Sequence, residues 1–119
     1  MTMYRQGDLL FILDPGDPLA SVISRRDKGW SPVSRDGAGR IVLAEGEATG
    51  HAHAIHNIGA SLYGISLEER YLEVLAEAGI DVIHEEHAPL HLQRGSWRVV
   101  RQREHEYRSN EGGTRWIAD

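Results

Sequence analysis

The apolar residues of this chain fall into short runs that end at turn-forming residues, and this pattern constrains the fold more than any other feature. Leu9–Leu13 stops at a Pro- and Gly-rich segment, Ile41–Ala44 precedes a glycine-containing turn, and Ile80–His84 alternates apolar and polar positions. Ser96–Tyr107 is the longest strand candidate. Short runs bounded in this way predict strands. We therefore expect a mainly β fold, a small antiparallel barrel or sandwich with at most one short helix.

Two segments are harder to assign. Residues 14–39 are rich in proline, glycine and serine and lack a sustained period, so we expect a long surface loop with one helical turn near Leu19–Ile23. Residues 66–78 fit a helical stripe that begins at a capping box, and they also fit a strand in which Leu72, Val74 and Ala76 share a face. The all-β context favours the strand. With 119 residues, we expect a single β domain over 1–119.

The bulk composition narrows the classes of partner. The formal net charge of −5 argues against nonspecific binding of nucleic acid or anionic membranes by the whole surface. No apolar run approaches the roughly 20 residues needed to cross a bilayer, and the N-terminal residues lack a signal-peptide layout. The chain has no cysteine, so a disulfide framework is excluded. We expect a cytoplasmic protein without membrane contact.

Six of the seven histidines lie in two clusters. The first contains His51, His53 and His56, and the second contains His84, His87 and His91. Side chains at positions i and i+2 of a strand share a face, so His51 and His53 should project together while His56 points the other way. Such a pair offers two imidazoles to one metal ion, and further ligands must come from elsewhere.

We predict a metal site with the ligands His51, His53, His84 and His87, with Glu85 or Glu86 as carboxylate alternatives. If Glu86 does not ligate, it is our candidate catalytic residue, as a general base or as the group that orients a histidine. Without cysteine, the donors are imidazole and carboxylate, which suit a divalent transition metal such as zinc, iron or manganese. A metal-free polar pocket and scattered surface histidines are the alternatives.

The last predicted strand is basic and aromatic. Trp97 and Val99 share a face and should be buried, and Arg101 and Arg103 continue that face toward the rim. Arginines beside aromatic rings can bind nucleic acid, so Arg98, Arg101 and Arg103 are candidate contacts. Ion pairs with nearby glutamates are the alternative.

Four stretches carry a resemblance that spans most of the chain outside residues 14–39: Tyr4–Asp8, Val42–His53, His84–Pro89 and Gly95–Glu104. They resemble a group of small, uncharacterised bacterial and phage-associated proteins. This resemblance implies no particular activity.

His51-Ala52-His53, after a glycine-containing turn, also resembles the first motif of the cupin superfamily, whose small β-barrels hold a metal through an H-x-H pair. The sequence departs from that motif at Asn57 and Ile58, where a glutamate is expected, and His84 and His87 do not match the second cupin motif. The likeness implies a β-barrel with a histidine-lined pocket.

The leading functional prediction is a small metal-binding β domain, with a metalloenzyme acting through a histidine-lined pocket as the more specific form. The alternative is a non-enzymatic binding module of phage or mobile-element context that acts on nucleic acid or a protein partner. An unidentified small molecule and a second copy of the chain also stay open as partners.

Overall fold

The computed structural model describes residues 1–45, 50–64 and 69–102, and these form a mainly β fold with one helix. The elements are β1 (Met3–Gln6), β2 (Leu9–Asp14), α1 (Pro18–Asp27), β3 (Ile41–Glu45), β4 (Ala52–Ile55), β5 (Ala60–Tyr63), β6 (Glu69–Val74), β7 (Ile80–Val82), β8 (Leu90–Leu92) and β9 (Gly95–Arg101). The expected class is confirmed. No helix in the described residues is long and apolar enough to cross a membrane.

Five strands form an antiparallel sheet in the order β1-β2-β9-β6-β5. β9 lies at the centre, paired with β2 on one side and β6 on the other. β1 and β5 form the two edges, so the sheet does not close on itself within the described strands. Of the two architectures expected, the sandwich is the one that fits.

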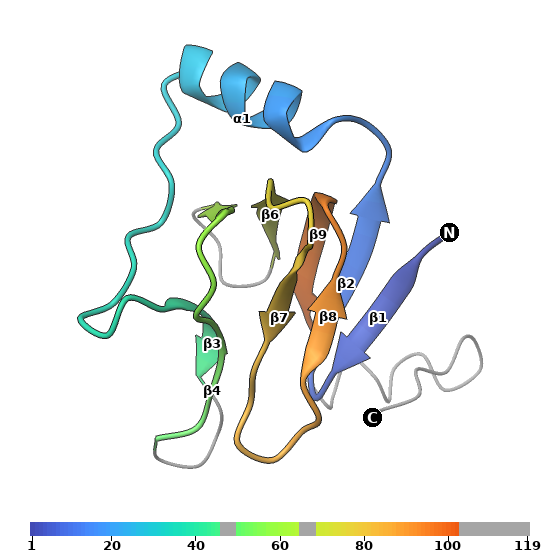
Figure 1. Cartoon of the computed structure of the whole chain (residues 1–119), viewed down its shortest axis with the longest axis vertical. Helices are drawn as coiled ribbons and strands as arrows, with labels where there is room; N and C mark the ends of the chain where they lie inside the picture. The colour runs from blue at the N-terminus through green and yellow to red at the C-terminus, as the bar shows by residue number, and fades with distance from the viewer. Residues whose placement is uncertain (46–49, 65–68, 103–119) are drawn as a thin grey trace.

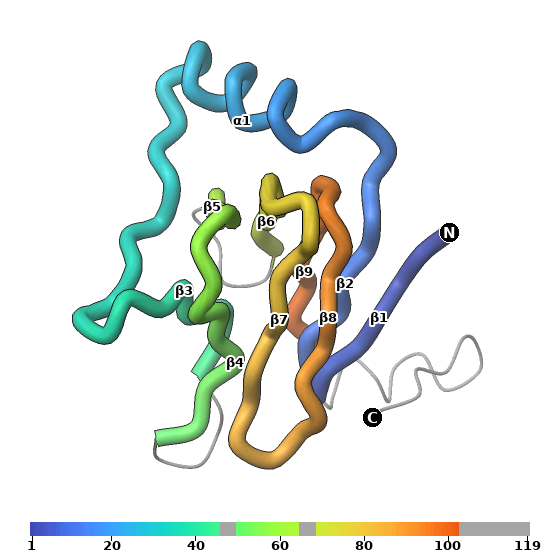
Figure 2. Tube along the Cα trace, viewed as in Figure 1, coloured from blue at the N-terminus to red at the C-terminus, as the bar shows by residue number. Residues whose placement is uncertain are grey.

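The second layer consists of two hairpins, β3–β4 and β7–β8. In Figure 1, β7–β8 lies in front of the large sheet and β3–β4 lies at the lower left, and both can be followed along the chain in Figure 2. The hairpins are joined by a short antiparallel bridge between Ala54 and Ile83. Two backbone hydrogen bonds form it: Ala54 N–H donates to Ile83 O at 3.0 Å, and Ile83 N–H donates to Ala54 O at 2.8 Å. This bridge sets the register of the site described below.

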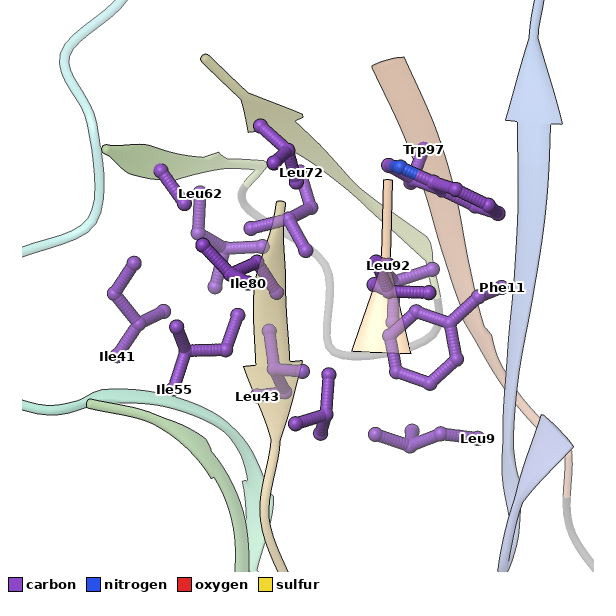
Figure 3. Close-up of a cluster of buried hydrophobic side chains, with 14 of the residues drawn as sticks. Leu9, Phe11, Ile41, Leu43, Ile55, Leu62, Leu72, Ile80, Leu92 and Trp97 are labelled. Atoms are coloured by element: carbon purple, nitrogen blue, oxygen red, sulfur yellow. The ribbon is translucent and has the colours of Figure 1, made fainter. Parts of the chain in front are cut away.

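The hydrophobic core fills the space between the layers (Figure 3). The large sheet contributes Phe11, Leu72 and Trp97, and the hairpins contribute residues such as Ile55 and Ile80, all nearly inaccessible to solvent. The indole N–H of Trp97 donates to Gln93 O at 3.0 Å, which satisfies its polar atom inside the core. The expected burial of Trp97 and Val99 is confirmed.

The expected long loop at 14–39 needs correction, because it contains the ten-residue helix α1. Asp17 caps this helix by accepting the Leu19 N–H at 3.2 Å, and Pro18 occupies the first turn, where a missing N–H costs nothing. The helix buries only Pro18 and Val22. Because only these two residues are buried, the sequence shows no apolar residues at helical spacing along α1. The sequence pattern therefore predicted only a single helical turn.

α1 lies at the end of the sheet where β2 stops and β9 starts (Figure 1). It contacts Glu73 and Ser96, which alternate along their strands with residues of the core. Its Arg25 donates two hydrogen bonds to the buried carboxylate of Glu73, and Ser96 bridges Glu73 and Ser21. These contacts satisfy a charge that would otherwise be costly to bury.

The ambiguous segment 66–78 contains the strand β6, as the alternation predicted, while residues 65–68 lie outside the described part. Leu72 and Val74 face the core. β6 is paired on both sides, by β5 and β9, and this tertiary pairing overrides the local helical tendency.

Candidate metal centre

The Ala54–Ile83 bridge explains how two histidine clusters, distant in sequence, meet. Continued by one step in the same antiparallel register, it sets His53 opposite His84. The next steps set Ala52 opposite Glu85 and His51 opposite Glu86. Each of these pairs is in contact in the structure. Strand register therefore brings the two histidine clusters together.

All four histidines predicted as ligands lie together, with the His84 ring at the centre. Its centroid is 4.3 Å from that of His53, 4.7 Å from that of His87 and 5.8 Å from that of His51. The His53 and His87 rings are stacked with centroids 6.1 Å apart. His56 is exposed and points elsewhere, as the strand alternation predicted.

Within this cluster, one set of donors is close enough to share an ion. Among the described residues, His51, His84 and Glu85 each offer one ligand atom, and these atoms lie within 4.8 Å of one another. Glu85 was expected only as an alternative ligand. His53 and His87 flank this set and are not part of it.

Hydrogen bonds prepare Glu85 to act as an anionic donor. Its Oε1 accepts the backbone N–H of Ala52 at 2.8 Å. This bond, helped by the residue's own N–H and by the nearby imidazoles, lowers the pKa of Glu85. The carboxylate is therefore ionised at neutral pH.

Glu86, the predicted catalytic residue, contacts a histidine of the set. Its Oε1 lies 3.2 Å from Nδ1 of His51. A carboxylate at one ring nitrogen holds the proton there and leaves the other nitrogen free to coordinate. The geometry thus fits the orienting role considered for Glu86.

His84 is the most enclosed histidine of the set. Burial lowers its pKa, and the neighbouring imidazoles of His53 and His87 lower it further. Its Nδ1 accepts the backbone N–H of Glu86 at 3.0 Å, so the proton of the neutral ring is on Nε2. A neutral imidazole is the form that binds metal.

His53 is held at both ring nitrogens. The amide nitrogen of the buried Gln6 donates to Val82 O and Ala88 O, both at 2.9 Å, which turns the amide oxygen toward the histidine. That oxygen lies 2.8 Å from His53 Nδ1 and accepts its proton. His53 Nε2 lies 3.3 Å from Asp8 Oδ1. Both ring nitrogens of His53 therefore already have a polar partner.

Asp8 links the cluster to the arginine at the end of β9. Its Oδ2 accepts Nε–H of Arg101 at 2.9 Å. Burial alone would raise the pKa of Asp8, but hydrogen bonds from His53 and Arg101 and their positive charges lower it to about 2. Asp8 is thus an ionised carboxylate at the edge of the cluster.

The turn between β1 and β2 allows the backbone to approach His87. Gly7 has φ = +57°, and a Cβ at this position would lie 2.8 Å from His87 Nε2 and 3.2 Å from His53 Cε1. Gly7 and Asp8 form a two-residue hairpin in which only the first residue has positive φ, the type II′ pattern. A larger residue would push the two rings away.

The sequence interpretation missed Gln6, Gly7 and Asp8 as parts of the site. A Gly-Asp pair before an apolar run is a hairpin signal that could have placed this turn. Only the tertiary structure shows that the turn meets the histidines.

The basic strand is engaged with carboxylates. Arg98 lies 3.5 Å from Glu69, and Arg101 pairs with Asp8, while Arg103 lies outside the described residues. Arg101 emerges beyond the buried Trp97 and Val99, as expected for the rim of that face. Arg98 and Arg101 therefore both form the ion pairs that were expected as the alternative to nucleic-acid contacts.

Fold and site together define a small open β sandwich with a cluster of histidines and carboxylates at the edge of its second layer. A family model described as "Domain of unknown function (DUF8820)" matches residues 5–102, and the chain belongs to this family. The match includes every described residue of the cluster. The expectation of an uncharacterised family is confirmed, whereas the phage and cupin links stay predictions. The comparisons with curated proteins and with solved structures found no match.

Proposed function

We propose that this domain binds a divalent transition metal through His51, His84 and Glu85. The observation that carries the proposal is the mutual distance of their donor atoms, all within 4.8 Å. Two imidazoles and one ionised carboxylate suit zinc, iron or manganese.

Three protein donors favour a catalytic role over a purely structural one. Structural zinc sites are closed by four protein ligands, whereas catalytic sites keep a position for water or substrate. Two histidines with one carboxylate also match the ligand set of non-haem iron oxygenases. We therefore extend the proposal to a metalloenzyme that uses metal-activated water or iron-centred oxygen chemistry. Glu86 would orient His51 in either case.

The hydrogen bonds around His84 add a structural requirement. Coordination through Nε2 needs the ring proton on Nδ1, where the Glu86 N–H now donates. Metal binding at Nε2 should therefore turn the Glu86 peptide, and a change in its amide NMR signal would report the event. Phage context and cytoplasmic location stay predictions.

The test is zinc, iron(II) and manganese binding by untagged protein, measured by calorimetry and elemental analysis. His51→Ala, His84→Ala and Glu85→Gln should each lower metal occupancy sharply, because an incomplete ligand set binds weakly. His91→Ala is the matched control, since His91 is exposed and paired with Asp81 away from the cluster. Wild-type protein that takes up no metal would refute the proposal, as would an equal loss in the control.

A variant series also decides between ligand sets. If His53 and His87 coordinate, as the sequence predicted, His53→Ala and His87→Ala should reduce occupancy as strongly as His84→Ala. If only His51, His84 and Glu85 coordinate, the two variants should keep most of the metal. Elemental analysis of all five variants separates these outcomes.

A further inference from the structure

A second site lies at the end of the core, between β3 and the large sheet. A cavity of about 300 Å³ is lined there by Val42, Leu43, Ala44, Glu45, Arg70 and Arg101. The β3–β4 register shifts between Val42 and Ala44, so β3 is irregular along this wall. The volume is at the lower end of the range for pockets that hold small organic molecules.

The two arginines of the cavity occupy positions where core residues would be expected. Arg70 shares the alternation of the buried Leu72, and Arg101 shares that of the buried Trp97. Arg70 is opposite Val99, two residues before Arg101, so the arginines are diagonal neighbours on the core-facing side. Two guanidinium groups thus replace apolar side chains where the core ends.

Within the described residues, only Arg101 of these two arginines has a carboxylate partner. Arg101 donates to Asp8 Oδ2 at 2.9 Å and to Glu45 O at 3.1 Å. Arg70 makes no hydrogen bond or ion pair with any part of the chain that the structure describes, and the Glu45 side chain pairs with neither arginine there. Burial lowers the pKa of Arg70, and the nearby charge of Arg101 lowers it further.

The backbone at Gly64, directly after β5, lies close to the stem of Arg70. Gly64 has φ = +134°, and a Cβ there would lie 3.2 Å from both Cα and Cγ of Arg70. The absence of a side chain at Gly64 therefore leaves room for the Arg70 side chain. A cation that lacks a counter-charge among the described residues and lies beside a second arginine favours an anion.

We propose that this cavity binds a small organic anion, with its carboxylate or phosphate held by Arg70 and Arg101 and its apolar part against Val42–Ala44. The further inference that this anion is the substrate of the metal centre rests on the proposed metal function. The cavity and the histidine cluster share the β3–β4 hairpin, in which Ala44 pairs with His53. Asp8 contacts both Arg101 and His53.

The first test is an NMR titration of chelator-treated protein, following the Nε–H signals of Arg70 and Arg101. Benzoate and phenyl phosphate are the anionic probes, and benzamide is the neutral probe of similar shape. We expect saturable shifts with at least one anion and none with benzamide, and the tighter anion identifies carboxylate or phosphate. No saturable shift with either anion would overturn the inference, and so would equal binding of benzamide.

Arg70→Gln should weaken binding of the anion at least about tenfold, because charge-assisted hydrogen bonds to the oxyanion are lost. Arg94→Gln is the matched control, since Arg94 pairs with Asp17 on the exposed surface. Arg70→Gln should melt no lower than wild type, because Arg70 has no ion-pair partner among the described residues and lies near the positive charge of Arg101. A lower melting temperature with unchanged anion affinity would show a structural role and contradict the inference.

The link to the metal has its own readout. In protein loaded with Mn²⁺, the ring protons of bound benzoate should relax faster than in the chelator-treated protein, and Arg70→Gln should abolish the difference. Unchanged relaxation in a sample shown to contain metal would overturn the substrate assignment. Failure of metal binding in a sample that still binds benzoate would refute the metal function and leave the anion site standing.

Discussion

His53 lies opposite His84 across the junction of the two hairpins, with ring centroids 4.3 Å apart. The sequence separates the two residues widely, and a single backbone bridge, Ala54 to Ile83, aligns them. A register shift of one residue would turn every side chain of one strand to the opposite face. The histidine cluster therefore depends on the Ala54–Ile83 bridge, which also joins the two hairpins of the second layer.

Metal binding should stabilise the folded protein. A ligand that binds only the native state adds about 2.7 kcal/mol when its concentration is about 100 times its Kd. Zinc should accordingly raise the melting temperature of wild-type protein and of His91→Ala, and EDTA should reverse the increase. His84→Ala should show no increase, because it lacks a donor. Equal stabilisation of His84→Ala would place the metal elsewhere.

Trp97 should dominate the stability of β9. Its side chain is 1 % exposed and packs in the core, so Trp97→Ala should lower the free energy of unfolding by roughly 3–5 kcal/mol. Arg98→Ala should lower it by about 0–1 kcal/mol, since its pair with Glu69 is half-exposed. Denaturant melts measure both values. A Trp97→Ala variant as stable as wild type would be incompatible with the fold.

The Arg98 and Arg101 variants also test the nucleic-acid alternative. If these arginines bind nucleic acid, Arg98→Ala and Arg101→Ala should stay folded, lose affinity and show a shallower salt dependence. If they serve only as ion-pair partners, wild-type protein should not be retained on nucleic acid even at low salt. Filter binding with single- and double-stranded DNA distinguishes the two.

Local patterns were sufficient for the strands that bury apolar residues. The run in β2, the alternation in β6 and the buried face of β9 were all readable, because each faces a single core. β1 and α1 were not, because each exposes most of its side chains and is held by tertiary contacts. Secondary-structure patterns report burial, and these two elements bury little.

The site was predictable in part for the same reason. The i and i+2 spacing put His51 and His53 on one face, and the second cluster offered partners. Glu85, and not Glu86, has a carboxylate oxygen close to the ligand atoms of His51 and His84. This follows from the register of the bridge between the hairpins, which the sequence does not reveal. The contacts of Gln6 and Arg70 depend on segments far apart in the chain, which no local pattern encodes.

Gly7 should be intolerant of a side chain. Gly7→Ala forces an alanine to φ = +57° and sets its Cβ 2.8 Å from His87 Nε2. Backbone strain of this kind costs on the order of 1–3 kcal/mol, and the histidine ring must also move. Gly37→Ala is the control, because a Cβ there meets nothing within 4 Å and no positive φ is required. Thermal melts should separate the variants, and equal stabilities would contradict the tight hairpin.

Asp8 should make the fold sensitive to acid in a defined range. Burial opposes ionisation, but hydrogen bonds and charges from His53 and Arg101 lower the pKa from 3.8 to about 2. A group with a depressed folded-state pKa contributes stability above its unfolded pKa and loses that contribution as pH falls through the folded value. The contribution of Asp8 should therefore be complete above about pH 4 and disappear toward about pH 2.

The measurement is the melting temperature of wild type, Asp8→Asn and Glu77→Gln across this acid range. Asp8→Asn should be less stable than wild type at neutral pH, and the difference should shrink as both are acidified below about pH 4. Glu77→Gln should keep the wild-type pH dependence, because Glu77 is exposed and forms no ion pair within the described residues. A constant difference between Asp8→Asn and wild type at every pH would mean that the carboxylate charge does not stabilise the turn. In that case, the link from Arg101 through Asp8 to His53 would be packing without electrostatic coupling.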